Sequence, residues 1–137
     1  MTVDLTSSWF IAPGCEDQVE AALTQLAAAV LQDEPGTLTY LVHRPLPATS
    51  GLQSLPPPPG ELVLFFERYA DVAAFQAHVN GPLFQGFVAN YGQCFIGTGG
   101  KPFSTVQFLT PIAGFVERGG DTDDQRENDQ SSHTHLT

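Results

Sequence analysis

The first half of the chain carries the hydrophobic patterns of a strand, a long helix and a second strand. An apolar centre at residues 9–11 predicts a strand over residues 6–12, which Pro13 and Gly14 end. A helix over about residues 15–32 is predicted because apolar residues recur at spacings of four, three and four: Val19, Leu23, Leu26 and Val30. Alternation over residues 37–43 predicts the next strand, with Leu38, Tyr40 and Val42 on one face.

The second half repeats this order with shorter elements. Residues 62–69 predict a strand, and Asp71 is a suitable N-cap for a helix over residues 72–79. Pro82 suits the first position of a further helix through residue 91, so the second helix is broken in two. A turn at residues 97–102 and a strand at 103–110 follow. The order β-α-β-β-α-β is that of the ferredoxin-like fold, an α+β class with a four-stranded antiparallel sheet and helices on one face.

The third predicted strand is apolar on both of its faces. Leu62, Leu64 and Phe66 fall on one face, whereas Val63 and Phe65 fall on the other. A strand without polar alternation is buried on both sides, but the helices of this fold cover only one face of the sheet. We therefore expect a second copy of the chain to cover the other face, in a homodimer whose interface includes Val63 and Phe65.

Two segments depart from these regular patterns. Residues 45–60 are rich in Pro, Ser and Gly, with consecutive prolines at 56–59, and predict a long loop insertion. Residues 117–137 are polar and acidic and predict a disordered tail, because so few apolar residues cannot offset the entropy of ordering. The prediction is one domain over residues 1–116, with the tail after it.

Composition narrows the range of partners and locations. The chain has 15 acidic and 5 basic residues and a net charge of −10, so we expect neither nucleic acid nor a membrane surface as a partner. A neutral or weakly acidic small molecule fits this charge. The sequence has no apolar run of about 18 residues and no signal-peptide pattern. Cys15 and Cys94 have no metal-ligand spacing, so we expect reduced thiols in a cytoplasmic protein.

Two stretches resemble a known family. They are E-P-G-T-L-T-Y from Glu34 and F-F-E-R-Y-A-D-V-A-A-F-Q-A-H-V-N-G-P-L-F at residues 65–84. Both are similar to the antibiotic biosynthesis monooxygenase domain, and the most specific part is the run E-x-Y-x-D-x-x-A-F-x-x-H. The resemblance covers residues 5–110. It implies a dimeric α/β barrel in which two sheets face each other and each subunit holds a pocket between its sheet and its helices.

The resemblance also implies a choice of chemistries. Many members of the family oxidise phenols or hydroquinones with molecular oxygen and no cofactor, whereas related proteins degrade haem, isomerise lactones or only bind ligands. The haem-degrading branch has tryptophan at the position of His78 and its iron-binding histidine at the position of Val88. The haem ligand is therefore absent here. The insertion at residues 45–60 is also longer than is usual in the family.

His78, Glu67 and Tyr69 are the candidate catalytic residues. His78 shares a helical face with Phe75, so it is expected to point inward, where a histidine suits the removal of a proton from a phenol. The alternative is a structural histidine bonded to a backbone carbonyl or to Glu67. Glu67 and Tyr69 share a strand face. Glu67 could orient His78 or pair with an arginine, and Tyr69 could donate a hydrogen bond to a bound oxygen atom.

The substrate pocket is expected to be mostly aromatic. Its predicted wall consists of Ser7, Trp9, Tyr40, Phe65, Phe75, Phe84 and Phe87. For the aromatic residues, a purely structural place in the core is the alternative. No metal site is expected, because His133 and His135 form a pair without a third ligand, and His43 is expected to be exposed.

Three functions fit these observations. The first is a cofactor-independent monooxygenase that oxidises a small aromatic molecule. The second is a non-catalytic binding or accessory protein, and the third is a non-oxidative isomerase or cyclase. Oxygen consumption distinguishes the first from the other two.

Overall fold

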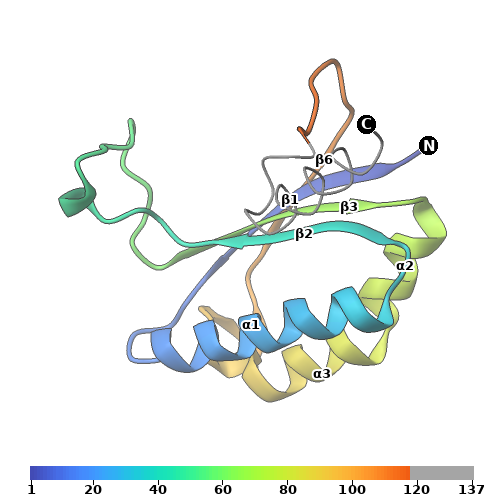
Figure 1. Ribbon diagram of the computed structural model, residues 1–137. Coiled ribbons are helices and arrows are strands. Elements are labelled where there is room, and N and C mark those ends of the chain that lie inside the picture. Colours follow the sequence, from blue (N-terminus) through green and yellow to red (C-terminus); the bar gives the residue numbers. More distant parts are fainter. Residues whose placement is uncertain (118–137) are drawn as a thin grey trace, which may run out of the picture.

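The computed structural model describes residues 1–117, and its elements follow the predicted order (Figure 1). The elements are β1 (Val3–Phe10), α1 (Glu16–Asp33), β2 (Thr37–His43), the short helix η1 (Ala48–Ser50), β3 (Leu62–Tyr69), α2 (Val72–Asn80), α3 (Pro82–Tyr91), the short helix η2 (Gly92–Cys94), β4 (Gly97–Thr98), β5 (Lys101–Pro102) and β6 (Thr105–Leu109). The predicted α+β, ferredoxin-like class is confirmed. Beyond Glu117, the predicted tail lies outside the described residues.

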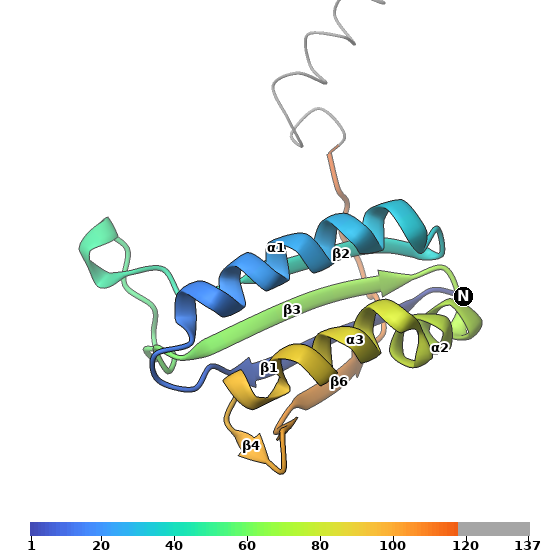
Figure 2. The same ribbon diagram turned by 90° about the horizontal axis from the view of Figure 1, so that it is seen from below.

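The main sheet has the strand order β2-β3-β1-β6, with antiparallel neighbours throughout. Helices α1, α2 and α3 lie on one face of this sheet (Figures 1 and 2). Among residues 1–117 no helix covers the other face, and the sheet of a single chain does not close into a barrel. The two middle strands are therefore the best covered, and β2 and β6 form the edges.

Several predicted boundaries need correction. Strand β1 begins at Val3 rather than at residue 6, because Val3 already pairs with Tyr69 of β3. Beyond Phe10, Ile11 contributes only a single bridge to Phe95. Strand β6 begins at Thr105 rather than at residue 103. The predicted turn at residues 97–102 contains a small hairpin of β4 and β5.

Helix α1 packs on the sheet through the predicted apolar stripe. Its buried residues are Val19, Ala22, Leu23, Leu26 and Val30. The helix ends where Pro35 stops it, and the backbone N–H of Glu34 donates to the carbonyl of Val30 at 3.0 Å. This last bond fixes Glu34 at the end of the helix, close to the edge of the sheet.

Strand β3 has the predicted span, but its two faces exchange roles. Val63 and Phe65 are buried in the core beneath the helices, so the prediction that they form a dimer interface is wrong. Leu64 and Phe66 lie on the open face instead. Sequence alternation identifies two faces, but the packing of the helices decides which of them is inside.

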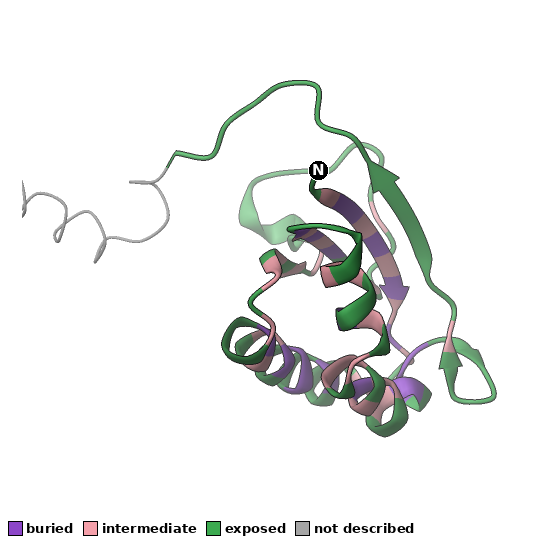
Figure 3. Cartoon of the chain, turned by 90° about the vertical axis from the view of Figure 1, so that its right-hand side faces the viewer, coloured by how far each residue is buried: buried purple, intermediate pink, exposed green. Residues whose placement is uncertain are grey.

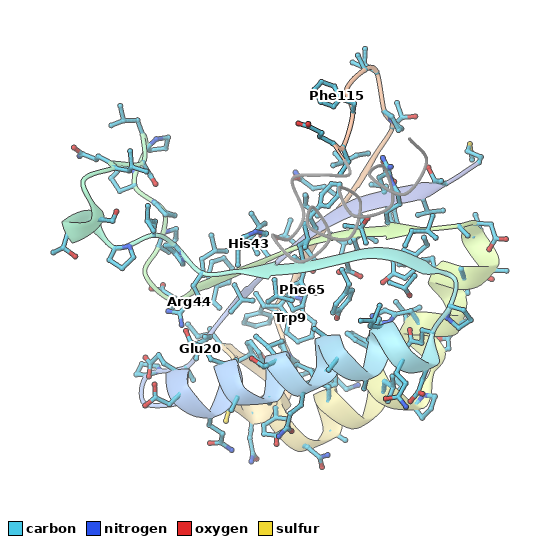
Figure 4. The ribbon with its side chains drawn as sticks, in the orientation of Figure 1. Trp9, Glu20, His43, Arg44, Phe65 and Phe115 are labelled. Atoms are coloured by element: carbon cyan, nitrogen blue, oxygen red, sulfur yellow. The ribbon has the colours of Figure 1, made fainter. Side chains whose placement is uncertain are left out.

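Strand β2 also differs from a simple alternating pattern. Its pairing with β3 shifts between Thr37 and Thr39, and this irregularity sets Leu38 apart from Tyr40 and Val42. Leu38 is exposed, whereas Tyr40 and Val42 pack against the core. His43 is exposed as predicted and points away from the helices (Figure 4).

Strand β6 is poorly covered. All of its residues are exposed, including Phe108 at 61%, and Figure 3 shows the strand set apart from the helices. On the helix side, Phe108 lies beside Phe75 of α2, with ring centroids 5.3 Å apart. After β6 the chain leaves the domain, and Phe115 on this segment is 90% exposed (Figure 4).

Arg44 holds the base of the long loop. Its guanidinium donates to the carbonyls of Gly60 at 2.8 Å and Leu62 at 3.0 Å, and also to the carboxylate of Glu20 on α1 at 2.8 Å. Arg44 and Glu20 face each other at the end of the sheet from which the loop projects (Figure 4). The loop is thus closed at its two ends before it extends outward (Figure 1).

On the open face, Arg68 and Asp4 form a bidentate ion pair. The two nitrogens of Arg68 lie 2.8 and 2.9 Å from the two carboxylate oxygens of Asp4. These hydrogen bonds hold the pKa of Asp4 below its usual value. In the part of the chain that the structure describes, no helix has the length and hydrophobicity needed to cross a membrane.

Helix α2, which carries His78, begins at a side-chain cap. The carboxylate of Asp71 accepts a hydrogen bond from the backbone N–H of Ala74 at 2.8 Å. We predict that Asp71→Ala lowers the free energy of unfolding by about 1 kcal/mol, because an unpaired amide is left at the start of the helix. Urea unfolding measures this loss. Asp71→Asn, which retains an acceptor oxygen, is the control, and an equal loss in both variants would contradict a capping role.

Candidate functional site

A cavity of about 90 Å³ lies between the sheet and the helices. Its lining contains every residue predicted for the catalytic set and the pocket wall except Tyr69. The lining consists of Leu5, Ser7, Trp9, Leu26, Tyr40, Phe65, Glu67, Phe75, His78, Val79, Phe84, Phe87, Ser104 and Val106. The fold thus brings together residues that are far apart in sequence.

Two rows of paired residues on the sheet form the floor of this cavity. In one row, Glu67 of β3 pairs with Tyr40 of β2 and with Leu5 of β1. In the next row, Ser7 of β1 lies between Phe65 of β3 and Val106 of β6. Directly opposed residues share a face, so each row presents its side chains to the helices. Because β6 is exposed, the cavity approaches the surface at Val106.

Trp9 forms the aromatic wall at one end. Its ring lies 5.7 Å from Phe65, 5.9 Å from Phe84 and 5.0 Å from Phe95, measured between ring centroids. Its indole N–H donates to the hydroxyl of Ser7 at 2.9 Å. Trp9 and Phe65 both point from the sheet toward α1 (Figure 4). The hydroxyl of Ser7 therefore positions Trp9 and is already partly engaged before any ligand binds.

His78 is the polar centre of the site. It lies on α2, one turn after Phe75, and its side chain is 2% exposed. Its Nδ1 atom is 2.6 Å from Oε1 of Glu34. A carboxylate only accepts hydrogen bonds, so Nδ1 carries the proton of this bond. In the neutral imidazole, Nε2 then has a lone pair on the opposite side of the ring.

Glu34 is the residue that sequence reasoning missed. The predicted partner of His78 is Glu67, but Nε2 lies 4.0 Å from Oε1 of Glu67, which is too long for a direct hydrogen bond. Glu34 follows the last residue of α1, so the helical pattern of apolar residues does not predict where its side chain points. The sequence shows Glu34 in the E-P-G stretch. Its contact with His78, however, depends on how α2 packs against the end of α1.

Glu67 and Tyr69 form a buried pair of their own. The predicted role of Tyr69 is to donate a hydrogen bond to a bound oxygen atom. Its hydroxyl instead donates to Oε1 of Glu67. Glu67 is paired with a tyrosine rather than with an arginine. Burial raises the pKa of Glu67, against the smaller lowering effects of the Tyr69 hydrogen bond and of His78. Glu67 therefore keeps a proton to higher pH than an exposed glutamate does.

Both tyrosines near His78 stay neutral. Burial raises the pKa of Tyr40, and the charges of Glu67 and Glu34 raise it further. The pKa of Tyr69 is raised by burial and then by Glu67. A neutral phenol side chain donates a hydrogen bond but does not act as a base. A base in this cavity is therefore to be sought at Nε2 of His78.

The remaining candidates lie apart from this site. A hydrogen bond with the thiol of Cys15, and after it burial, raises the pKa of Cys94. A thiol with a raised pKa is less nucleophilic at neutral pH. Within residues 1–117, no group of three or more His, Cys, Asp or Glu side chains is placed to hold a metal ion. His133 and His135 lie outside the described residues.

Comparisons with known proteins agree with this fold. The sequence model of the family described as "Antibiotic biosynthesis monooxygenase" matches residues 5–90. No curated protein matches the chain. Among solved structures, Rv0793 from Mycobacterium tuberculosis is 18% identical with a TM-score of 0.62, covering 83% of this chain and 98% of that one.

Two further solved structures are similar to the same degree. PA3566 from Pseudomonas aeruginosa is 21% identical with a TM-score of 0.61, covering 82% of this chain and 95% of that one. A protein described as an antibiotic biosynthesis monooxygenase is 18% identical, also with a TM-score of 0.61, covering 82% of this chain and 100% of that one. At these identities the similarity establishes the fold.

The raised pKa of Glu67 predicts how stability depends on pH. Between the pKa of this group in the unfolded chain, about 4.3, and its higher value in the native state, the native protein binds more protons, so stability falls as pH rises. Glu67→Gln removes this titration and keeps an acceptor for Tyr69. We predict that the variant gains stability relative to the wild type from pH 4 to pH 7, measured by urea unfolding. A constant difference would contradict the assignment.

Proposed function

The chain belongs to the antibiotic biosynthesis monooxygenase family, and we propose that it oxidises a small phenol or hydroquinone with molecular oxygen and without a cofactor. The observation that carries this proposal is His78. It is a buried imidazole in an aromatic cavity, with one ring nitrogen bonded to Glu34 and the other turned toward the cavity side. A base in an apolar pocket can generate a phenolate away from water.

The chemistry starts with a proton transfer. Nε2 of His78 takes the phenolic proton, and the anion that results passes one electron to O₂, giving superoxide and a substrate radical. The two radicals combine at a ring carbon to form a peroxide anion, which takes a proton back from His78 to become a hydroperoxide and then loses water to leave a carbonyl. For a hydroquinone the balance is hydroquinone plus O₂ to hydroxyquinone plus water. One oxygen atom enters the product and the other leaves as water.

The walls of the cavity favour a neutral aromatic ring. The rings of Trp9, Phe65 and Phe84 offer flat apolar contacts, and the carboxyl group of Glu67 on the cavity wall disfavours an anion. The cavity, at about 90 Å³, is smaller than one of about 150 Å³ that binds benzene, so its wall must shift to admit one ring. We propose that a single-ring substrate enters beside β6 and that the exposed side chain of Val106 makes this shift.

The protein is further proposed to act as a homodimer. Leu41, Leu64 and Leu109 are exposed on the open face of the sheet, and Phe66 lies between Leu41 and Thr6 in one cross-strand row. An apolar sheet face of this kind favours a partner, and a second copy offers the same surface by two-fold symmetry. The interface proposed here consists of this open face, in place of Val63 and Phe65.

A second candidate function is a non-oxidative isomerase or cyclase. The observation that favours it is the pairing of two proton-exchanging groups across 4.0 Å, Nε2 of His78 and Oε1 of Glu67. Because the pKa of Glu67 is raised, this carboxyl can return a proton that His78 has removed from another position. Product formation in the absence of oxygen would support this candidate over the monooxygenase.

We predict that His78→Ala lowers the rate of oxygen uptake with 1,4-dihydroxybenzene at least about 100-fold, because the base is lost. An oxygen electrode measures the rate, and labelled ¹⁸O₂ should place one oxygen atom in the product. His78→Gln, which is closer in size, guards against a folding defect, and circular dichroism checks both variants. Unchanged uptake in folded variants would remove His78 as the base, and a product without ¹⁸O would overturn the monooxygenase.

For the dimer, we predict that Phe66→Asp yields a monomer, because a carboxylate on the open face would be buried against a second apolar sheet. Light scattering at micromolar concentration gives the mass of the particle in solution. The matched control is Leu31→Asp, on an exposed position of α1. A wild-type protein that is already monomeric, or a control that dissociates equally, would contradict the proposed interface.

A further inference from the structure

The pair formed by Glu34 and His78 separates two hollows of the molecule. On one side lies the aromatic cavity, which His78 lines. On the other side lies a surface groove of about 400 Å³ between the end of α1 and helices α2 and α3. Glu34 lines this groove, together with Asp33, Pro35 and Leu83. The Glu34–His78 hydrogen bond therefore stands between the cavity and this groove.

The exposure of the two side chains follows this arrangement. The side chain of Glu34 is 16% exposed, whereas that of His78 is 2% exposed. The 2.6 Å contact between Nδ1 and Oε1 is slightly shorter than the ~2.7–2.9 Å of charge-assisted N–H···O bonds. Nδ1 thus faces the groove through Glu34, and Nε2 faces the cavity on the other side of the ring. An imidazole with this geometry can accept a proton at one nitrogen and release another from the opposite nitrogen.

We propose that Glu34 is the proton exit of the site, a role that rests on the proposed function of His78. When Nε2 takes the substrate proton, the imidazole becomes a cation with a proton on each nitrogen. The proton on Nδ1 passes to the carboxylate of Glu34, which releases it to water in the groove. His78 is then neutral with its proton on Nε2. Nε2 gives that proton to the peroxide formed from superoxide and the substrate radical, and Nδ1 takes a proton back from the groove through Glu34. This restores the base, and the turnover releases no net proton.

The other titratable groups around His78 do not offer the same route. Glu67 is buried on the cavity side and accepts the hydroxyl of Tyr69. Tyr40 and Tyr69 are neutral phenols whose pKa values are raised by burial. Asp33 lies in the groove but has no contact with the imidazole among the hydrogen bonds and ion pairs of residues 1–117. Glu34 is the group that joins the imidazole to the groove.

The first test separates proton transfer from simple positioning. Glu34→Gln retains an oxygen that accepts the Nδ1 proton, so His78 keeps its orientation, but an amide cannot carry the proton onward. With 1,4-dihydroxybenzene as substrate, we expect kcat to fall by about tenfold or more while KM stays within about twofold. Glu34→Ala should lose activity as well, and small acids that enter the groove, such as formate, should restore it in a saturable way.

The matched control is Asp33→Asn, which removes a carboxylate from the same groove and should leave kcat unchanged. A Glu34→Gln variant as fast as the wild type would overturn the exit role and leave Glu34 with a positioning role alone. An equal loss in Asp33→Asn would overturn it too, because the effect would then come from the charge of the groove. Absence of rescue by formate in a folded Glu34→Ala variant counts against the exit in the same way.

A second measurement does not depend on turnover. Nitrogen-15 NMR of labelled protein reports which ring nitrogen of His78 carries the proton, and how fast that proton exchanges with water. We expect Glu34→Gln to keep the proton on Nδ1 but to slow its exchange by about tenfold or more. Equal exchange in the two proteins would overturn the exit. If wild-type protein consumes no oxygen while Glu34→Gln slows the exchange, the proposed oxidation fails and the proton path stands.

Discussion

A buried imidazole must keep its hydrogen-bonding groups satisfied, and this constraint connects most parts of the domain. His78 lies inside the core, where an unpaired polar group costs about 1–3 kcal/mol. Glu34 meets this requirement only because α1 ends one residue earlier and Pro35 prevents a further turn. Asp71 starts α2 at the position that brings His78 opposite Glu34. In residues 1–117 every fully shielded side-chain nitrogen or oxygen has a partner, whereas Nε2 of His78 borders the cavity.

The coverage of the sheet explains where the cavity lies. Helices α1 and α3 pack over the inner strands, where Val63 and Phe65 are buried, and leave β6 exposed at the edge. The floor of the cavity runs across the inner strands, and the cavity approaches the surface beside β6, where the helices leave the sheet uncovered. The site therefore combines a rigid end, held by the rings around Trp9, with a less confined end at Val106. This asymmetry lets binding and stability depend on different residues.

The fold could be predicted from the sequence because its elements are periodic and well punctuated. Strand β3, the stripe of α1 and the cap at Asp71 all follow local rules, and the walls of the cavity follow from the topology that these elements impose. The spacing of apolar residues does not predict the contact of Glu34 with His78, because this contact joins the ends of two helices. The direction of Val63 and the pairing of Tyr69 with Glu67 also depend on tertiary packing. Local pattern therefore predicts faces, and packing decides which face is buried and which partners meet.

The clamp at Arg44 has a consequence for how the long loop can vary. Arg44 binds the carbonyls of Gly60 and Leu62 across the base of the loop, so the geometry of β2 and β3 does not depend on the residues between them. Closing a longer loop adds only about 0.6 kcal/mol for each doubling of its length. The segment from Pro45 to Pro59 can thus change in length at a small cost in closure entropy while the clamp holds the ends of β2 and β3. A fluorophore or an epitope placed there would report on the protein without entering its fold.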